Sequence, residues 1–347
     1  MAILRSLAIL TALLLAAVAL PAEERAATPK GATSKKDVMV YFEGSGSSHS
    51  LTTFYKYFDQ LPTDTFNTDI HGVVSGTAPA SALAFARSKH MLTFATVSNF
   101  GATDFDPKIA HAVLTRGATK KKALQGMLRI VRANGYSGIN LDYESVPHKD
   151  RAAYTAFVAA LAKEMRAAGY LTVVSVPAEL KDNPNDSWTG AFNFRAIGGT
   201  ADIIQLMTYD ENGPWGPPGP VAGKDWTEAC VQFAVSVIPS AKISMGLPIY
   251  GYDWNLTKGT GVQVAWKDIP ALIASTGATP LWDKTSSSPY FDYATTTGDN
   301  HVVWYEDSTS IPLKSAFAVT YNLAGVSAFA LGFDDVNYWK AVHAGGF

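Results

Sequence analysis

The chain has 347 residues, of which 47% are hydrophobic, 12% aromatic and 17% charged, and its formal net charge is −2. Such a composition can bury a large core, which excludes a wholly disordered chain. The near-zero charge gives no electrostatic basis for binding nucleic acid, because proteins that do so usually carry a basic excess. The length suits one α/β barrel of roughly 250 residues with additional segments.

The first residues have the pattern of a secretory signal peptide. Arg5 precedes a short apolar run, Leu7–Leu20, and Ala22 is a small residue at which cleavage could occur. A membrane span needs about 20 apolar residues, so this run is short, although an uncleaved anchor is an alternative. We expect a signal peptide over residues 1–22, a flexible lead-in over 23–37, and a secreted or periplasmic protein with no membrane association beyond export.

The chain has a single cysteine, Cys230, so no disulfide can form within it. Its neighbours are apolar and helical in pattern, with no basic residue nearby in sequence to activate the thiol. We therefore expect Cys230 to be packed in the core.

Short runs rich in Val, Ile and aromatic residues alternate with helical patterns, which indicates βα units and a parallel sheet. The expected strands are Val38–Phe42, Asp69–Val74, Met91–Val97, Gly138–Asp142, Leu171–Pro177, Ile203–Thr208, Lys242–Pro248 and Val326–Leu331. Eight such strands are what a closed (β/α)8 TIM barrel requires. We expect this barrel to occupy residues 38–347.

Two helices have the clearest periodicity. One is expected over Lys120–Ala133 and ends at Gly135. The other is expected over Asp150–Ala168, with Asp150 as its N-cap and Gly169 as its stop.

The interval between the seventh and eighth strands, about residues 252–310, is too long for a loop and one helix. It contains three strand-like runs, Val262–Trp266, Tyr290–Tyr293 and Val302–Tyr305, and an apolar helical run at Ile269–Ala274. These runs predict a small α+β insertion on one rim of the barrel.

The segment Gly138–Glu144 carries the most specific chemical signal. Alternate side chains of a strand face the same side, so Asn140, Asp142 and Glu144 are expected on one face and apolar residues on the other. Three polar groups are costly to bury without a purpose. A wet face of an edge strand is one explanation. A catalytic row at the carboxyl end of a barrel strand is the other.

Further polar and aromatic residues follow the expected ends of other strands, where the catalytic groups of such barrels lie. They are Asn99, Tyr209, Asp210, Tyr250, Trp254 and Phe329. Ser, His and Cys form no nucleophilic triad in the sequence, and the histidines lack metal-ligand spacing. We therefore expect neither a metal nor an organic cofactor.

These motifs resemble family 18 glycoside hydrolases, the chitinase-like barrels. The fourth-strand motif of that family, Asp-x-x-Asp-x-Asp-x-Glu, appears here as Ser137-x-x-Asn140-x-Asp142-x-Glu144 and departs at its first two acids. The sixth-strand Met-x-Tyr-Asp is matched by Met207–Asp210. Asn140 and the 213–220 loop are most similar to the bacterial branch with spore-cortex and other peptidoglycan N-acetylglucosaminidases.

The resemblance implies a role for each residue. Glu144 would donate the proton, and the neighbouring carboxylate of Asp142 would raise the pKa of that acid. The nucleophile would be the substrate's own 2-acetamido oxygen, with Asp142 and Tyr209 holding that group. The residues expected to contact the sugar are Asn140, Asp210, Asn99, Tyr250, Trp254 and Phe329, of which Phe329 stands where the family has Trp.

Asn140 cannot carry charge where the family has a second acid, so Asp142 is expected to ionise more easily than in a triple-acid site. The expected activity is cleavage of N-acetylglucosamine-containing glycans, peptidoglycan or chitin-type, by a monomer. A non-catalytic, lectin-like barrel is the alternative, because fold does not fix function. Intact Glu144 argues against that alternative, since binding alone needs no general acid.

Overall fold

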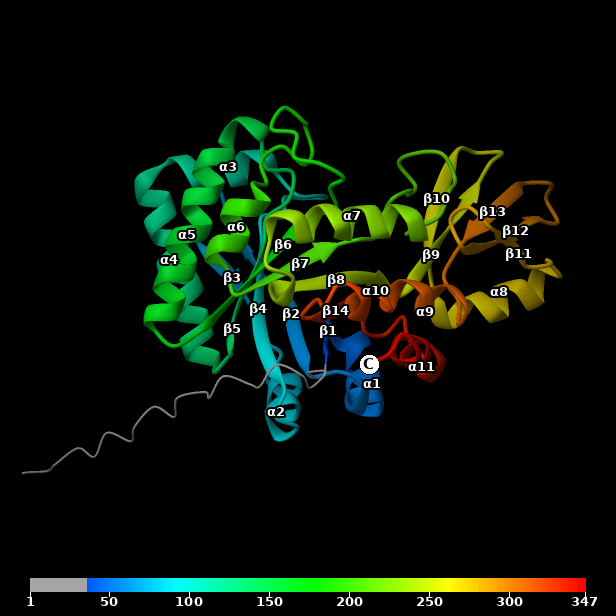
Figure 1. Cartoon of the computed structure of the whole chain (residues 1–347), viewed down its shortest axis with the longest axis horizontal. Helices are drawn as coiled ribbons and strands as arrows, with labels where there is room; N and C mark the ends of the chain where they lie inside the picture. The colour runs from blue at the N-terminus through cyan, green and yellow to red at the C-terminus, as the bar shows by residue number, and fades with distance from the viewer. Residues whose placement is uncertain (1–35) are drawn as a thin grey trace, which may run out of the picture. The chain divides into compact units, whose positions relative to one another are not determined.

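The structure is a computed structural model, and it describes residues 36–347 (Figure 1). The predicted signal peptide and all but the last two residues of the predicted lead-in lie outside the described residues. Among the helices of the described part, none is both long and apolar enough to cross a membrane.

Residues 37–329 contain eight strands that pair in parallel and close into a barrel. They are β1 (Asp37–Val40), β2 (Gln60–Thr68), β4 (Leu92–Ser98), β5 (Gly138–Asp142), β6 (Leu171–Pro177), β7 (Ile203–Met207), β8 (Ile243–Pro248) and β14 (Gly325–Phe329). Closure occurs at β1, which pairs with β14 on one side and with β2 on the other. The predicted (β/α)8 fold class is confirmed.

The second barrel strand was predicted in the wrong place. Residues 69–73 of the predicted strand form a turn, in which the Asp69 carboxylate accepts hydrogen bonds from the main-chain N–H groups of His71 and Val73 at 2.9 and 2.8 Å. This turn leads into the short β3 (Val74–Gly76), which pairs antiparallel with β2. The real barrel strand is β2, whose sequence is polar and includes a proline, so hydrophobicity did not reveal it.

Helices follow most of the barrel strands. They are α1 (Ser48–Phe54), α2 (Ala80–Ser88), α3 (Pro107–Thr115), α4 (Gly117–Asn134), α5 (Arg151–Ala167), α6 (Phe194–Thr200), α7 (Lys224–Val237), α9 (Ser310–Ser315), α10 (Phe317–Thr320) and α11 (Val336–Ala344). Gly135 and Gly169, with φ of 66° and 82°, end α4 and α5 as predicted. Asp150 stands at the N-cap of α5 but does not cap it, because its carboxylate is 2.7 Å from Nδ1 of His111.

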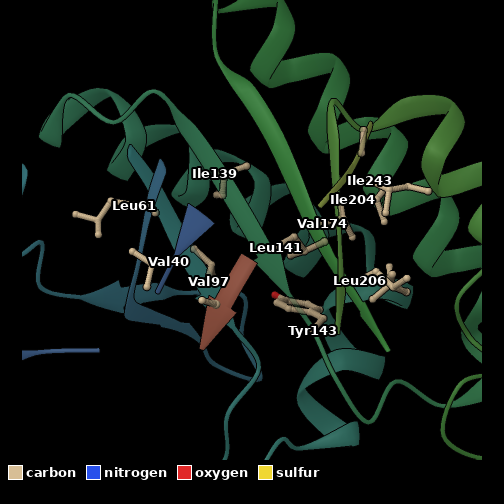
Figure 2. Close-up of a cluster of buried hydrophobic side chains, with 14 of the residues drawn as sticks. Val40, Leu61, Val97, Ile139, Leu141, Tyr143, Val174, Ile204, Leu206 and Ile243 are labelled. Carbon is tan, nitrogen blue, oxygen red and sulfur yellow. The ribbon is translucent and has the colours of Figure 1, made fainter. Parts of the chain in front are cut away.

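The main core lies between the barrel and its helices. Figure 2 shows part of this core. Val40, Leu61, Val97 and Leu141, from four barrel strands, belong to the same buried cluster as Tyr143. Cys230 is also fully buried, as predicted, and burial raises the pKa of its thiol to about 12. The thiol is therefore an unreactive part of the packing.

The predicted insertion is a five-stranded sheet with one helix, drawn in yellow and orange in Figure 1. Its elements are β9 (Tyr250–Asn255), β10 (Thr260–Ala265), α8 (Ile269–Thr276), β11 (Leu281–Asp283), β12 (Ser288–Ala294) and β13 (Asn300–Trp304). All its strand pairs are antiparallel. Because β9 begins two residues after β8 ends, the insertion starts directly at the carboxyl end of a barrel strand.

Candidate active site

Strand β5 separates polar from apolar side chains as the alternation predicts. Ile139, Leu141 and Tyr143 are fully buried in the core outside the barrel, where Figure 2 shows them. Asn140 and Asp142 therefore point to the barrel interior. The ring of Tyr143 stacks on Phe157 of α5 with centroids 5.9 Å apart, which anchors the end of the strand next to Glu144.

Asn140 is fully buried and links strands across the barrel. The Tyr41 hydroxyl donates to its Oδ1 at 3.0 Å, and its Nδ2 donates to Oγ of Ser175 at 3.0 Å. Both ends of the amide are occupied by partners within the protein. Asn140 therefore lies in the barrel interior and has no exposed surface for a sugar.

Asn99 is also fully buried, and it holds the main chain of Glu144. Its Oδ1 accepts from the Glu144 N–H at 2.9 Å, and its Nδ2 donates to the Glu144 carbonyl at 2.9 Å. The same Nδ2 lies 3.2 Å from the carbonyl of Asp106. These bonds use the whole amide, so the structure supports a positioning role for Asn99 in place of the predicted sugar contact.

Asp142 and Glu144 lie in an acidic, water-poor environment. Burial raises the pKa of Glu144 well above its usual range, and the negative charges of Asp142 and Asp210 raise it further. Burial raises the pKa of Asp142 to about 7, with the charge of Asp64 as the next cause and the Ser175 hydroxyl acting in the opposite direction. A carboxyl that keeps its proton near neutral pH can act as a general acid.

Tyr209 and Asp210 follow the end of β7, and both lie near Asp142 and Glu144 at the carboxyl end of the barrel. Asp210 adopts a left-handed conformation with φ of 62°, which turns its carboxylate back toward β9. There Oδ1 accepts from the hydroxyls of Tyr250 and Tyr252 at 2.7 and 2.9 Å. Burial raises the pKa of Tyr209 well above its usual range, so its hydroxyl stays a neutral donor.

The candidate sugar platforms differ greatly in exposure. Phe329 is partly buried. Its ring centroid lies 5.7 Å from that of Tyr41 and 6.2 Å from that of Tyr209, so Phe329 borders these two interior tyrosines. Trp254 is only 4% exposed, and its Nε1 donates to the Gly216 carbonyl at 3.2 Å. It therefore holds the 213–220 loop, whereas Trp215 on that loop is 71% exposed.

Two residues near the site escaped the sequence analysis. Asp64 was missed because it lies in β2, the strand that was misplaced. Tyr41 was missed because the first strand was predicted to run to Phe42, which placed Tyr41 inside the strand, whereas β1 ends at Val40 and Tyr41 follows it and donates a hydrogen bond to Asn140. Alternation from Met39 would have placed Tyr41 in the interior.

Comparisons with known proteins agree with this geometry. The sequence profile of the glycosyl hydrolases family 18 matches residues 33–334. The chain is 37% identical over 304 residues to a Bacillus subtilis protein described as "Uncharacterized glycosylase YvbX", covering 87% of this chain and 88% of that one. It is 25% identical over 287 residues to the cortical fragment-lytic enzyme of B. subtilis, covering 82% of this chain and 67% of the enzyme.

Among solved structures, the chitinase from Chromobacterium violaceum superposes with a TM-score of 0.85 at 36% identity, covering 90% of this chain and 99% of the chitinase. The profile match spans most of the chain, and the barrel carries an acid pair at the carboxyl end of β5. The chain therefore belongs to glycoside hydrolase family 18 and is a glycosidase.

Proposed function

We propose that this glycosidase cleaves β-1,4 linkages of N-acetylglucosamine-containing glycans with retention of configuration, using the acetamido group of the substrate as nucleophile. The observation that carries the proposal is the pairing of Asp142 with Glu144. The two acids are two residues apart on one strand end, and both have raised pKa values. Carboxyls on one strand edge are poorly placed to attack a sugar ring from opposite faces.

In the proposed first step, Glu144 gives its proton to the glycosidic oxygen while the acetamido oxygen attacks the anomeric carbon. The glycosidic bond breaks, and the ring that forms carries a positive charge. The carboxylate of Asp142 accepts the acetamido N–H and stabilises this charge, and the Tyr209 hydroxyl donates to the acetamido oxygen. Water then attacks the anomeric carbon, and Glu144 takes back a proton.

Chitin-type oligosaccharides are the substrate we favour. The chitinase from Chromobacterium violaceum is 36% identical and aligned over nearly its full length. The cortical fragment-lytic enzyme is 25% identical over part of its length, which makes peptidoglycan the second substrate to test. We also propose export, on the basis of residues 1–22, and action as a monomer without a cofactor.

Release of reducing ends from chitooligosaccharides and from purified peptidoglycan tests the proposal. The Glu144→Gln variant should lose turnover by roughly 10²–10⁴-fold while it still binds the glycan, because the amide keeps the shape but has no proton to donate. Glu164→Gln on α5, a matched change away from the site, should retain activity. Near-normal turnover by Glu144→Gln would overturn the assignment.

A further inference from the structure

The insertion approaches the active site at one end and returns to the barrel at the other. At its start, Tyr250 and Tyr252 of β9 donate hydrogen bonds to the Asp210 carboxylate. At its other end, the chain leaves β13 and enters α9 of the barrel, as Figure 1 shows. Glu306 lies in the short connection between β13 and α9, and its side chain is fully buried. This connection therefore places a buried acid where the insertion rejoins the barrel.

Glu306 forms an ion pair with Lys314 of α9. The Nζ atom of Lys314 lies 2.5 and 2.6 Å from the two carboxylate oxygens of Glu306, and both side chains are closed to solvent. Ser310, one turn earlier on α9, donates to the same carboxylate at 2.5 Å. A buried ion pair often stabilises a fold no more than apolar residues of similar volume would, but its hydrogen bonds are directional. Such a pair is suited to fixing one segment against another.

Lys314 also holds the turn between β11 and β12, which we call the 283–288 turn. Its Nζ donates to Oγ of Ser288 at 3.3 Å, and that hydroxyl donates to the Ser286 carbonyl at 3.3 Å. The carboxylate of Asp283 closes the turn by accepting from the Ser286 N–H at 2.8 Å. The ion pair is therefore joined to this turn through Ser288.

The 283–288 turn contacts the loop that follows Asp210. Its Ser286 carbonyl accepts from the Lys224 N–H at 2.7 Å. The residue before Lys224 is Gly223, which donates its N–H to Oε2 of Glu211 at 2.7 Å. Glu211 is the residue directly after Asp210 in the chain. Hydrogen bonds and short stretches of main chain thus connect the buried ion pair to the active site.

Gly223 leaves no room for a side chain between the loop and the turn. A Cβ atom added to it would lie 2.8 Å from Oε2 of Glu211 and 3.4 Å from Cβ of Ser286. Its φ of −58° is one that any residue adopts, so the glycine is required by close approach and not by backbone conformation. The loop and the turn are therefore in direct contact at this residue.

Asp210 has a conformation that depends on its surroundings. Its φ of 62° is sparsely populated for residues other than glycine, and such a conformation persists where neighbouring groups hold it. Burial raises the pKa of Asp210, whereas the hydrogen bonds from Tyr250 and Tyr252 lower it. If the insertion shifted on the barrel, these two bonds would lengthen and the pKa of Asp210 would rise.

We propose that Lys314 is a positioning residue for Asp210. With Glu306 and Ser288, it fixes the 283–288 turn against the loop after Asp210, and this contact keeps the insertion in the place where its β9 tyrosines reach the Asp210 carboxylate. Lys314 itself touches no substrate, because its side chain is fully buried. This inference rests on the proposed function, with Asp210 as a contact of the sugar.

The test compares Lys314→Met, Ser288→Ala and Gly223→Ala with wild type in the hydrolysis of a chitooligosaccharide. Lys314→Met should raise KM by about tenfold and change kcat less, because the loss falls on a hydrogen-bonded sugar contact. Ser288→Ala keeps the ion pair but cuts its link to the turn, so KM should rise less, in the same direction. Gly223→Ala should also raise KM, since the added methyl group forces the loop from the turn. Lys340→Met, the same change at an exposed lysine of α11, should leave KM unchanged.

A double variant, Glu306→Leu with Lys314→Met, separates positioning from stability. It should recover the stability that Lys314→Met loses, because no buried charge is left without its partner. Its KM should stay raised, since the apolar pair forms no hydrogen bond with Ser288. Denaturant unfolding measures the recovery. A stable double variant with the KM of wild type would overturn the inference, because packing alone would then be sufficient.

NMR titration of the Asp210 carboxyl gives a readout that needs no turnover. In Lys314→Met its pKa should be higher than in wild type by about one pH unit, and in Ser288→Ala by less. An unchanged Asp210 pKa in both variants would overturn the inference. If Lys314→Met fails to fold, Ser288→Ala and Gly223→Ala decide the question by the same measurements. Failure of the proposed function would look different, since Glu144→Gln would then stay active whatever the pKa of Asp210.

Discussion

The side-chain amide of Asn99 forms two hydrogen bonds, both of 2.9 Å, with the main-chain N–H and carbonyl of Glu144. This pair joins the loop after β4 to the residue after β5. The main chain of Glu144, the proposed proton donor, is thus fixed by a side chain from another strand end. The sequence had predicted a sugar contact for Asn99, whereas the structure shows its side chain holding the main chain of Glu144.

Asn99→Ala should lower kcat more than it raises KM, because Glu144 loses the two hydrogen bonds that set its position. Leaving two buried main-chain groups unpaired should also cost about 1–3 kcal/mol of stability for each. Asn99→Asp is the matched variant, since it keeps the acceptor for the N–H but loses the donor. Kinetics and denaturant unfolding check both effects, and a pure rise in KM for Asn99→Ala would restore the sugar-binding explanation.

The stability of the protein should fall as the pH rises from about 4 to about 7. Asp64 and Asp142 have pKa values of about 6 and about 7, above their usual range, so the folded state binds more protons than the unfolded state in this window. Their stabilising contribution is complete below the unfolded pKa and is lost as the pH passes the folded pKa. For Asp142 the loss is on the order of a few kcal/mol, at about 1.4 kcal/mol per pH unit.

Unfolding in denaturant at several pH values, for wild type and Asp142→Asn, isolates this contribution. The variant should gain stability relative to wild type as the pH rises, because an amide does not have to ionise in a buried place. An unchanging difference between the two proteins across the window would contradict the raised pKa of Asp142.

The two tryptophans near the 213–220 loop should respond differently to truncation. Trp215 is exposed, so Trp215→Ala should weaken glycan binding and leave stability nearly unchanged. Trp254 is buried, so Trp254→Ala should cost about 3–5 kcal/mol. Binding isotherms with a chitooligosaccharide and unfolding curves separate the two, and equal stability losses would show that Trp215 is also a packing residue.

Export makes a further prediction from the sequence alone. The charged start and short apolar run of residues 1–22 predict cleavage near Ala19 or Ala22. Mass spectrometry of the protein recovered outside the cytoplasm should find the mature N-terminus there. A full-length chain kept in the cytoplasm would contradict export.

The sequence predicted the barrel because seven of its strands are apolar enough to stand out, and because Gly135 and Gly169 mark helix ends unambiguously. The prediction failed at β2. Its few apolar residues that face the helices are separated by polar residues and by Pro62, whereas the adjacent turn has a more apolar sequence. That one error concealed Asp64, since a residue assigned to a loop is not considered as an interior acid.

For the site itself, alternation correctly oriented Asn140 and Asp142, because a strand leaves only two sides for its side chains. The partners of Asn99 and Trp254 could not be predicted in the same way. Their hydrogen bonds join segments far apart in the chain, Asn99 to Glu144 and Trp254 to Gly216, and such bonds depend on the paths of loops that periodicity does not describe.

The most direct test of the proposed mechanism is ¹H NMR of the first-formed product during cleavage of a β-linked N-acetylglucosamine oligomer. Attack by the acetamido group followed by water inverts the anomeric carbon twice, so the nascent reducing end should be the β anomer. Oligomers of plain β-1,4-glucan, which lack the acetamido group, should not be cleaved. A nascent α anomer, or efficient cleavage of the plain glucan, would contradict substrate assistance by way of Asp142 and Tyr209.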